Sequence, residues 1–225
     1  MSKTNAISNG DIAIAVLAMA IVVVASNFLV QFPVEGTVGG LVLADLLTWG
    51  AFTYPAAFLV TDLTNRRFGP AAARRVVYAG FVLAVALSVV LATPRLAVAS
   101  GSAFLVAQLL DVTLFNRLRR AAWWKAPLVS SVIGSVVDTL IFFSIAFSPL
   151  FTGLLGYHDD FAVENAPLFG IFAAELPRWI SWALGDLTVK LSVALFLLAP
   201  YRILFAFIRP MQDAAPEAGS APFSR

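Results

Sequence analysis

Long apolar stretches alternate with short polar segments along most of this chain. A helix that crosses a lipid bilayer needs about 20 mostly apolar residues. Six stretches satisfy this requirement: Ile12 to Gln31, Leu41 to Val60, Val76 to Thr93, Val98 to Phe115, Leu128 to Pro149, and Trp179 to Pro200. The pattern predicts an all-α, polytopic membrane protein with six transmembrane helices, which form one domain over residues 1–210.

The two ends of the chain need separate interpretation. Residues 211–225 are rich in Ala, Pro, Gly and Ser without apolar periodicity, which is typical of a disordered tail with no chemistry of its own. Near the other end, Ala18 to Ala20 resembles a signal-peptide cleavage site. The long apolar run and the polar Asp11 favour a retained first helix over a cleaved one.

The distribution of basic residues predicts the orientation. Six helices place both termini on one side, and most Arg and Lys residues between the windows fall on that side: Lys3, Arg66, Arg67, Arg74, Arg75, Arg117, Arg119, Arg120, Lys125, Arg202 and Arg209. The other side carries only Arg95 and Arg178. Because basic residues of short loops are retained in the cytoplasm, we expect both termini and the two Arg-rich loops to be cytoplasmic.

Composition agrees with this prediction and removes several function classes. With 60% hydrophobic residues, 12% charged residues and a mean hydropathy of +0.88, the chain has too much apolar surface for a water-soluble globule. A net charge of +2 does not indicate a nucleic-acid partner. The sequence contains no cysteine, which excludes disulfides and thiol chemistry.

A proline interrupts the second apolar window. Pro55 removes a backbone hydrogen bond and is expected to kink or break the helix near Phe52. Interrupted helices are common in transporters, where the freed backbone groups line a site. A simple packing kink explains the same feature equally well.

Ionisable residues within the apolar windows are the strongest functional signal. Asp45, Asp111, Asp138, Asp186 and Lys190 all lie there, and each costs at least ~2.5 kcal/mol at the membrane centre. Four carboxylates face a single ammonium group, so some must be neutral, hydrated, near an interface or bound to a ligand. Structural interhelical hydrogen bonding remains an alternative role for any one of them.

Spacing along the predicted helices suggests how these groups are arranged. Asp138, Gln108, Lys190 and Trp49 fall near the middle of their windows, so we expect them to share one layer. Asp186 and Lys190 are four residues apart and can pair along one helix face.

Further polar and aromatic residues complete the predicted site. Gln108 and Asp111 are three residues apart and project together, and Asn27 adds a polar group near the outer end of the first helix. Trp49 and Phe142 lie close enough to the polar layer to stack on a flat heteroaromatic solute. The candidate substrate-binding residues are Asn27, Trp49, Gln108, Asp111, Phe142, Asp138, Asp186 and Lys190.

Several motifs together point to a known family. The first two are Ser26 to Gln31 and a long run from Thr48 to Arg75, which contains Thr48 to Pro55 and Thr61 to Thr64. The others are Gln108 to Val112 with Phe115 to Arg119, Asp138 to Leu140 with Phe142 and Phe143, Ile145 to Phe147, and Asp186 with Lys190. These segments touch every predicted helix except the third. They resemble the queuosine precursor transporter family, a group of six-helix bacterial inner-membrane proteins.

The resemblance implies a transport domain that imports deazaguanine bases, the cyano or aminomethyl precursors of the tRNA nucleoside queuosine. Asp138 or Asp111 would accept the N–H groups of the guanine-like edge, with Gln108 beside them. Trp49 or Phe142 would stack the ring. The implied partners are this small molecule and the lipid bilayer, with no cofactor and no metal. The sequence leaves a homo-oligomer, the preferred base and the energy source open.

Two other functions compete with this one. An intramembrane enzyme is disfavoured because the sole histidine, His158, lies in the outer loop, so no Ser-His dyad or histidine-rich metal site can be built. The segment Ala183 to Asp186 lacks the first glycine of the Gly-x-Gly-Asp motif of aspartyl intramembrane proteases. The other alternative is a substrate-binding membrane subunit that needs a separate ATP-driven module, since the chain has no phosphate-binding loop of its own.

Overall fold

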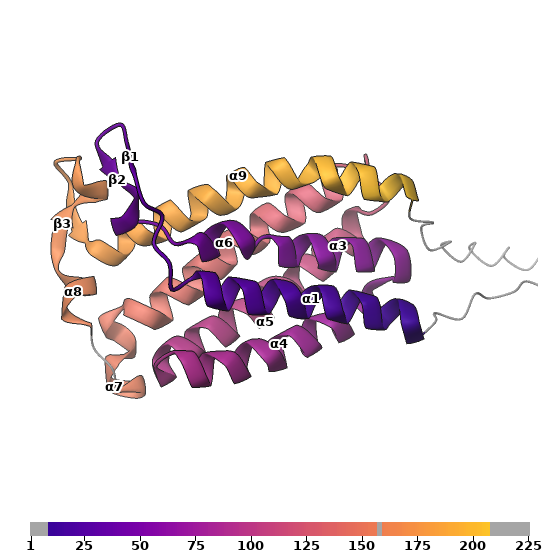
Figure 1. Ribbon diagram of the computed structural model, residues 1–225, viewed down its shortest axis with the longest axis horizontal. Helices are drawn as coiled ribbons and strands as arrows, with labels where there is room; N and C mark the ends of the chain where they lie inside the picture. Colours follow the sequence, from indigo (N-terminus) through magenta and orange to yellow (C-terminus); the bar gives the residue numbers. More distant parts are fainter. Residues whose placement is uncertain (1–8, 157–158, 208–225) are drawn as a thin grey trace, which may run out of the picture.

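The computed structural model describes residues 9–156 and 159–207 as a bundle of long helices (Figure 1). Within these residues, five helices are long and apolar enough to cross a membrane. They are α1 (Asn9–Leu29), α4 (Pro70–Leu91), α5 (Pro94–Leu118), α6 (Lys125–Phe147) and α9 (Arg178–Phe207). The chain is therefore a mostly helical, polytopic membrane protein. His158 and the predicted tail lie outside the described residues.

The second predicted window differs from a single helix. The window begins in a short β-hairpin, in which β1 (Thr37–Val38) pairs with β2 (Leu41–Val42), and the 3₁₀ turn η1 (Leu43–Asp45) follows. Gly39 and Gly40 connect the strands with φ of +58° and +87°, the left-handed conformations of a tight two-residue hairpin turn. An apolar window cannot distinguish such a segment from a helix, so the prediction that a helix begins at Leu41 is wrong.

Helical structure begins later in this segment and is broken at the expected proline. The short α2 (Trp49–Thr53) ends before Tyr54 and Pro55, and α3 (Ala56–Phe68) follows. The interruption predicted from Pro55 is confirmed. Together α2 and α3 stand where one transmembrane helix was expected, so the count of six spanning helices stays a prediction.

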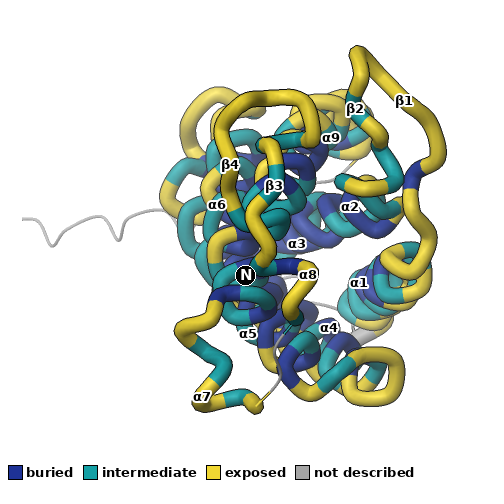
Figure 2. Tube along the Cα trace, turned by 90° about the vertical axis from the view of Figure 1, so that its left-hand side faces the viewer, coloured by how far each residue is buried: buried dark blue, intermediate teal, exposed yellow. Residues whose placement is uncertain are grey.

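The α3 helix occupies the centre of the bundle. It contacts α1, α4, α5, α6 and α9, and the end-on view in Figure 2 shows it among these helices with many buried positions. Its sequence explains this position, because Thr61, Asp62, Asn65 and Arg66 are all buried on it. Such side chains are unfavourable against lipid, so the five longer helices enclose them.

The two ends of the bundle have different characters (Figure 1). The helix α1 begins, and α9 ends, at the same end as the α3–α4 and α5–α6 connections, where most of the arginines of the loops lie. The opposite end carries β1, β2 and the following short elements: η2 (Pro149–Phe151), α7 (Thr152–Leu155), α8 (Asp160–Val163), β3 (Asn165–Pro167), η3 (Leu168–Gly170) and β4 (Glu175–Pro177). We call these the basic end and the hairpin end. That the basic end is cytoplasmic stays a prediction.

Prolines mark most helix boundaries as their positions suggest. Pro70 opens α4 directly after Gly69, and α6 ends just before Pro149. Pro200 does not close the last helix, because α9 continues through it to Phe207. A proline within a membrane helix is tolerated where neighbouring helices and side chains satisfy the freed carbonyl group.

Candidate functional site

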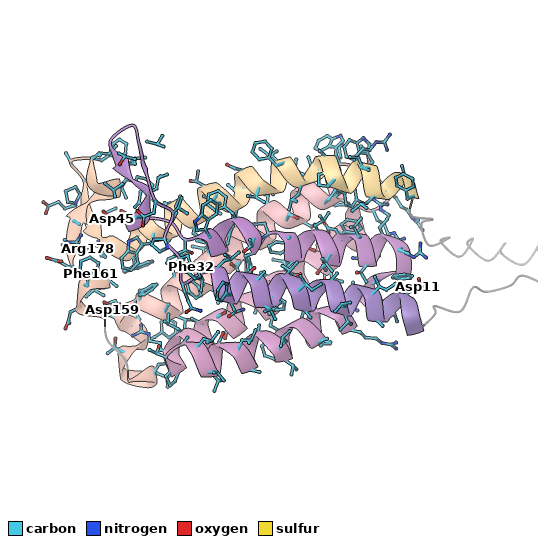
Figure 3. All side chains as sticks on the ribbon, viewed as in Figure 1. Asp11, Phe32, Asp45, Asp159, Phe161 and Arg178 are labelled. Atoms are coloured by element: carbon cyan, nitrogen blue, oxygen red, sulfur yellow. The ribbon has the colours of Figure 1, made fainter. Side chains whose placement is uncertain are left out.

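A cavity of about 590 Å³ lies inside the hairpin half of the bundle and is partly open to its surroundings. Its walls come from α1, α2, the start of α3, α4, α5, α6 and α9, with the segment Ala44 to Thr48 and Phe161 of α8 near the hairpins. Figure 3 shows Asp45 and Phe161 at this end of the molecule. The volume is within the range of small-molecule binding sites, and the lining is mainly apolar, as such sites usually are.

A charged cluster of four residues lies at the deep end of this cavity. The Lys190 ammonium group donates hydrogen bonds to Asp138 Oδ2 at 2.7 Å and to Asp186 Oδ2 at 2.5 Å. The Tyr54 hydroxyl donates to Asp138 Oδ1 at 2.8 Å. Since Asp186 and Lys190 share one face of α9, the predicted pairing between them is confirmed. We call Tyr54, Asp138, Asp186 and Lys190 the carboxylate–lysine cluster.

The members of this cluster are not equally available to a ligand. The side chains of Asp138 and Lys190 are only 5% and 6% exposed, whereas that of Asp186 is 16% exposed. Asp186 Oδ2 also accepts a hydrogen bond from the Thr139 hydroxyl at 3.0 Å. No hydrogen bond within the described residues reaches Asp186 Oδ1. This oxygen is therefore an acceptor that a ligand in the cavity can use.

The same cluster also offers a donor and an excess of negative charge. The ammonium group has three N–H donors, and two are directed at carboxylates. Lys190 Nζ also lies 5.1 Å from the centre of the Tyr54 ring, within the range of a cation–π contact. Two carboxylates face one ammonium group, which leaves one formal negative charge at the deep end of the cavity.

Aromatic side chains form much of the wall above the cluster. The Phe142 and Phe143 rings lie edge to face with their centres 5.1 Å apart. Phe147 packs against Trp182 of α9 in a similar way at 5.4 Å, and Phe161 lies 6.2 Å from the same tryptophan. Flat, apolar ring surfaces next to one charged cluster suit a planar solute that has a polar edge.

The cavity also contains polar groups nearer its mouth. Asn27 donates from its side chain to the Val23 carbonyl oxygen of its own helix at 2.9 Å. Ser88 of α4 lies beside it, with its hydroxyl 3.5 Å from Asn27 Oδ1. Asp45 and Thr48 line the cavity at the hairpin end. These groups can meet polar atoms at the far side of a ligand.

The structure brings five of the eight predicted binding residues to the cavity: Asn27, Asp138, Phe142, Asp186 and Lys190. Trp49 is not among the lining residues; its side chain is 48% exposed and packs on Phe52 with ring centres 5.6 Å apart. The depth assigned to Trp49 assumed a helix from Leu41. Because α2 begins at Trp49 itself, this residue lies at a helix end instead.

Gln108 and Asp111 lie outside the cavity lining, in a second buried polar region. Gln108 Oε1 accepts a hydrogen bond from the Thr61 hydroxyl of α3 at 2.6 Å. Asp111 is fully buried one turn further along α5, next to Val112, whose carbonyl oxygen accepts a hydrogen bond from Asn65 Nδ2 of α3. Helix spacing correctly placed Gln108 and Asp111 in the bundle interior, but it could not show which partner helix they face.

Two residues of these polar regions were missed as site residues by sequence reasoning. Tyr54 is not singled out by the sequence analysis, although it lies next to Pro55, which breaks the helix. Asp62 lies beyond the second window, which ends at Val60, so it was not counted among the intramembrane carboxylates. Once α3 restarts at Ala56, Asp62 lies nearly two turns inside it and is 1% exposed. The hairpin signal at Gly39 and Gly40 was the feature that would have corrected both positions.

Comparison with known proteins identifies the chain's relatives. The family described as "Putative vitamin uptake transporter" matches residues 48–93 and 87–204. The queuosine precursor transporter of Escherichia coli is 36% identical over 208 residues, which cover 82% of this chain and 81% of the relative. A probable queuosine precursor transporter of Haemophilus influenzae is 39% identical over 225 residues, with 87% of each chain covered. No solved structure gives a significant match.

These matches span most of the chain and include the helices that carry the carboxylate–lysine cluster. With its apolar helices, the protein is a multi-pass protein of the inner membrane. Its relatives are named as transporters rather than enzymes. The resemblance seen in the sequence motifs is confirmed, and the chain belongs to the vitamin-uptake-transporter-like family of queuosine precursor transporters.

Proposed function

We propose that this protein imports queuosine precursors, the cyano or aminomethyl deazaguanine bases, and that it binds them in the cavity above the carboxylate–lysine cluster. Two relatives that are more than one-third identical to the chain are named for this substrate. The observation that carries the proposal is a cavity whose only deep charges are two carboxylates joined by one lysine, counted within the described residues.

The hydrogen-bonding edge of a deazaguanine base matches the free groups of this cluster. The edge presents a carbonyl oxygen next to adjacent N–H donors. Lys190 has an N–H left for the carbonyl oxygen, and Asp186 Oδ1 can accept from a neighbouring N–H. Asp138 holds Lys190 and Tyr54 in place through its two oxygens. Asp186 is thus the carboxylate that meets the base, and Asp138 orients the lysine.

The flat faces of the base would stack between aromatic side chains of α6 and α9. Phe142 and Trp182 line the cavity on these two helices, near Asp138 and Asp186 respectively. Base–aromatic stacking contributes about 1–3 kcal/mol per base in other proteins. Stacking holds the plane of the ring, while the polar edge selects among planar solutes.

The excess negative charge of the cluster favours one of the two precursors. An aminomethyl substituent carries a positive charge at neutral pH, whereas a cyano substituent is neutral. One unpaired negative charge in a water-poor cavity attracts the cation more strongly than it would in bulk water. We therefore expect tighter binding of the aminomethyl base.

The arrangement of open and closed regions corresponds to one state of a transport cycle. The cavity lies in the hairpin half, while Arg66 closes the basic half by donating to the Arg119 carbonyl oxygen at 2.6 Å and to the Tyr201 hydroxyl at 3.2 Å. The Arg66 guanidinium also lies over the rings of Phe115 and Phe205. With the basic end in the cytoplasm, this is an outward-facing state. We call Arg66, Tyr201, Phe115 and Phe205 the inner gate.

Uptake into liposomes that contain only this protein tests the proposal. Labelled aminomethyl and cyano bases are supplied outside, and Asp186→Asn and Asp138→Asn are compared with wild type at equal protein level. Loss of a hydrogen bond to a charged group costs about 1.5–3 kcal/mol, so Asp186→Asn should weaken binding about 10- to 100-fold.

Asp11→Asn is the matched control, because Asp11 is only half-buried at the basic end and pairs with Arg67. It should transport like wild type. No uptake by the wild-type protein alone would contradict the proposal and favour dependence on a separate ATP-driven module. Normal uptake by both cluster variants would remove the proposed site.

A further inference from the structure

Two carboxyl groups lie against each other in the centre of the bundle, outside the cavity. Asp62 of α3 and Asp111 of α5 lie between two hydrogen bonds that join these helices, from the Thr61 hydroxyl to Gln108 Oε1 and from Asn65 Nδ2 to the Val112 carbonyl oxygen. The two residues are 1% and 0% exposed. The Ser130 hydroxyl of α6 donates to Asp62 Oδ1 at 3.4 Å. Two ionised carboxylates at this depth would repel each other strongly, since the surroundings are poor in water.

Acceptor atoms exceed donors around this pair. Within the described residues, neither oxygen of Asp111 accepts a hydrogen bond, although both are fully buried. The Asn65 side-chain oxygen, one turn from Asp62, also has no donor, while its amide nitrogen donates to the Val112 carbonyl oxygen beside Asp111. The Gln108 amide nitrogen, one turn from Asp111, is a donor and also has no partner among the described residues. The three unpartnered oxygens outnumber its two N–H groups, so this region lacks at least one donor.

The charged groups that face the carboxyl pair do not supply this donor. Arg66 is one turn from Asp62 on α3 and attracts it electrostatically, but its guanidinium donates to the Tyr201 hydroxyl and to the Arg119 carbonyl oxygen. From α9, the nearest titratable group is the Tyr201 hydroxyl, which accepts from Arg66.

On the other helices, no charged side chain of the described residues donates a hydrogen bond to Asp62 or Asp111. From α4, the buried residues packed on the neighbouring helices are apolar, among them Ala73, Val76 and Val77. On α1, the acidic residue of the described range is Asp11, which pairs with Arg67 near the surface. A proton shared between Asp62 and Asp111 would supply the donor that the buried Asp111 oxygens lack.

We propose that Asp62 and Asp111 form a proton-binding site, separate from the base-binding cavity, and that this proton is carried together with the substrate. The proposal rests on the proposed transport function. When one carboxyl group is protonated, its O–H donates to the other, and the pair carries one negative charge instead of two. Carboxyl pairs in contact bind a proton in this way because both cannot ionise at once.

The position of this pair connects it to both the base site and the inner gate. Ser130 and Asp138 are eight residues apart along α6, which corresponds to about 12 Å along a helix. Tyr54 stands just before the break at Pro55, and Asp62 lies six residues into α3. Helix α6 and the segment from Tyr54 into α3 thus join the proton site to the carboxylate–lysine cluster.

Asp62 also lies next to a path toward the basic end. A small hollow of about 10 Å³ is lined by Asp62, Ser131 and Tyr201, which is about the volume that one water molecule needs. If the pair loses its proton, Asp62 becomes a charged partner for Arg66 one turn away on the same helix. This competes with the bonds of Arg66 in the inner gate, so proton release and gate opening favour each other.

Infrared spectroscopy of the purified protein tests the proton site without any substrate. A shared proton gives the C=O stretching band of a carboxylic acid at neutral pH, and this band shifts in D₂O. Asp62→Asn and Asp111→Asn should each remove it, while Asp11→Asn should leave it unchanged. The proposal would be overturned if the wild-type protein shows no such band, or if neither variant removes it.

A transport experiment then separates coupling from substrate binding. At equal pH on both sides, exchange of labelled for unlabelled base should proceed in wild type, Asp62→Asn and Asp111→Asn. With the outside one pH unit more acidic, wild type should accumulate the base up to about tenfold for each proton carried. Both variants should only equilibrate it, to a concentration ratio of about one.

The two measurements keep the two proposals distinguishable. No base exchange by wild type would remove the proposed function, whereas the infrared band would still decide whether the proton site exists. Normal exchange with unchanged gradient-driven accumulation in both variants would remove the coupling role of Asp62 and Asp111. Should one variant be obtained in low amount, the other still shows whether the band belongs to the pair, since each should remove it.

Discussion

Replacing Lys190 by Met tests whether the carboxylate–lysine cluster is an integrated charge network. The ammonium group makes contacts of 2.7 Å and 2.5 Å with two carboxylates. Methionine keeps the length and apolar stem of the side chain but removes the charge. The variant leaves Asp138 and Asp186 buried together without an opposite charge.

The expected loss of stability follows from these contacts. At an effective dielectric constant of about 20, each contact supplies about 6 kcal/mol of Coulomb attraction. Desolvation of several kcal/mol per ion offsets much of this. Removing one partner of a buried pair costs about 3–5 kcal/mol in measured cases, and we expect a decrease of this size in the free energy of unfolding of Lys190→Met.

The assay is equilibrium unfolding in mixed micelles, with Lys125→Met as the control. Lys125 is exposed at the start of α6 and lies over Trp124, so its loss should change stability by less than about 1 kcal/mol. Adding Asp138→Asn to Lys190→Met should recover part of the loss, because it removes a charge left without a partner. If Lys190→Met is as stable as the control, or if the double variant loses the sum of both single effects, the network interpretation is refuted.

Three further variants test other parts of the structure. In Gly50→Ala the new methyl carbon would lie 2.9 Å from the Val30 backbone, so the free energy of unfolding should fall by about 1–3 kcal/mol. Gly153 has open space around it, so Gly153→Ala should leave the free energy of unfolding nearly unchanged. Arg95→Met removes two hydrogen bonds, at 2.7 Å and 2.5 Å, to carbonyl oxygens at the end of α6, and thermal or denaturant unfolding should show a loss of about 2–4 kcal/mol. Because the chain has no cysteine, Ser100→Cys places a unique thiol in the cavity wall; a polar maleimide should label it, and deazaguanine base should slow the labelling.

The sequence predicted most helices because apolar length is a strong signal in membranes. Five of the six windows overlap long helices of the structure, since a bilayer requires about 20 apolar residues from every spanning helix. The pairing of Asp186 with Lys190 was also predictable, because four residues bring two side chains to one helix face.

Contacts between helices were not predictable in the same way. Asp138 and Lys190 are 52 residues apart in sequence, and Tyr54 and Asp138 are 84 apart. Helical periodicity fixes which residues share a face, but it does not say which other helix that face meets. The second window failed for a different reason, because apolar hairpin residues and apolar helix residues have the same composition.

The central position of α3 explains how so many polar groups persist in one membrane protein. Along this chain segment, Tyr54 reaches the carboxylate–lysine cluster, Asp62 belongs to the carboxyl pair, and Arg66 closes the inner gate. Such a polar sequence would be unstable against lipid, and five surrounding helices remove it from lipid contact. The break at Pro55 leaves α3 free of a continuous helical connection to α2. The polarity that lowers the hydropathy of α3 is thus the same property that lets one short helix connect the base site, the proton site and the gate.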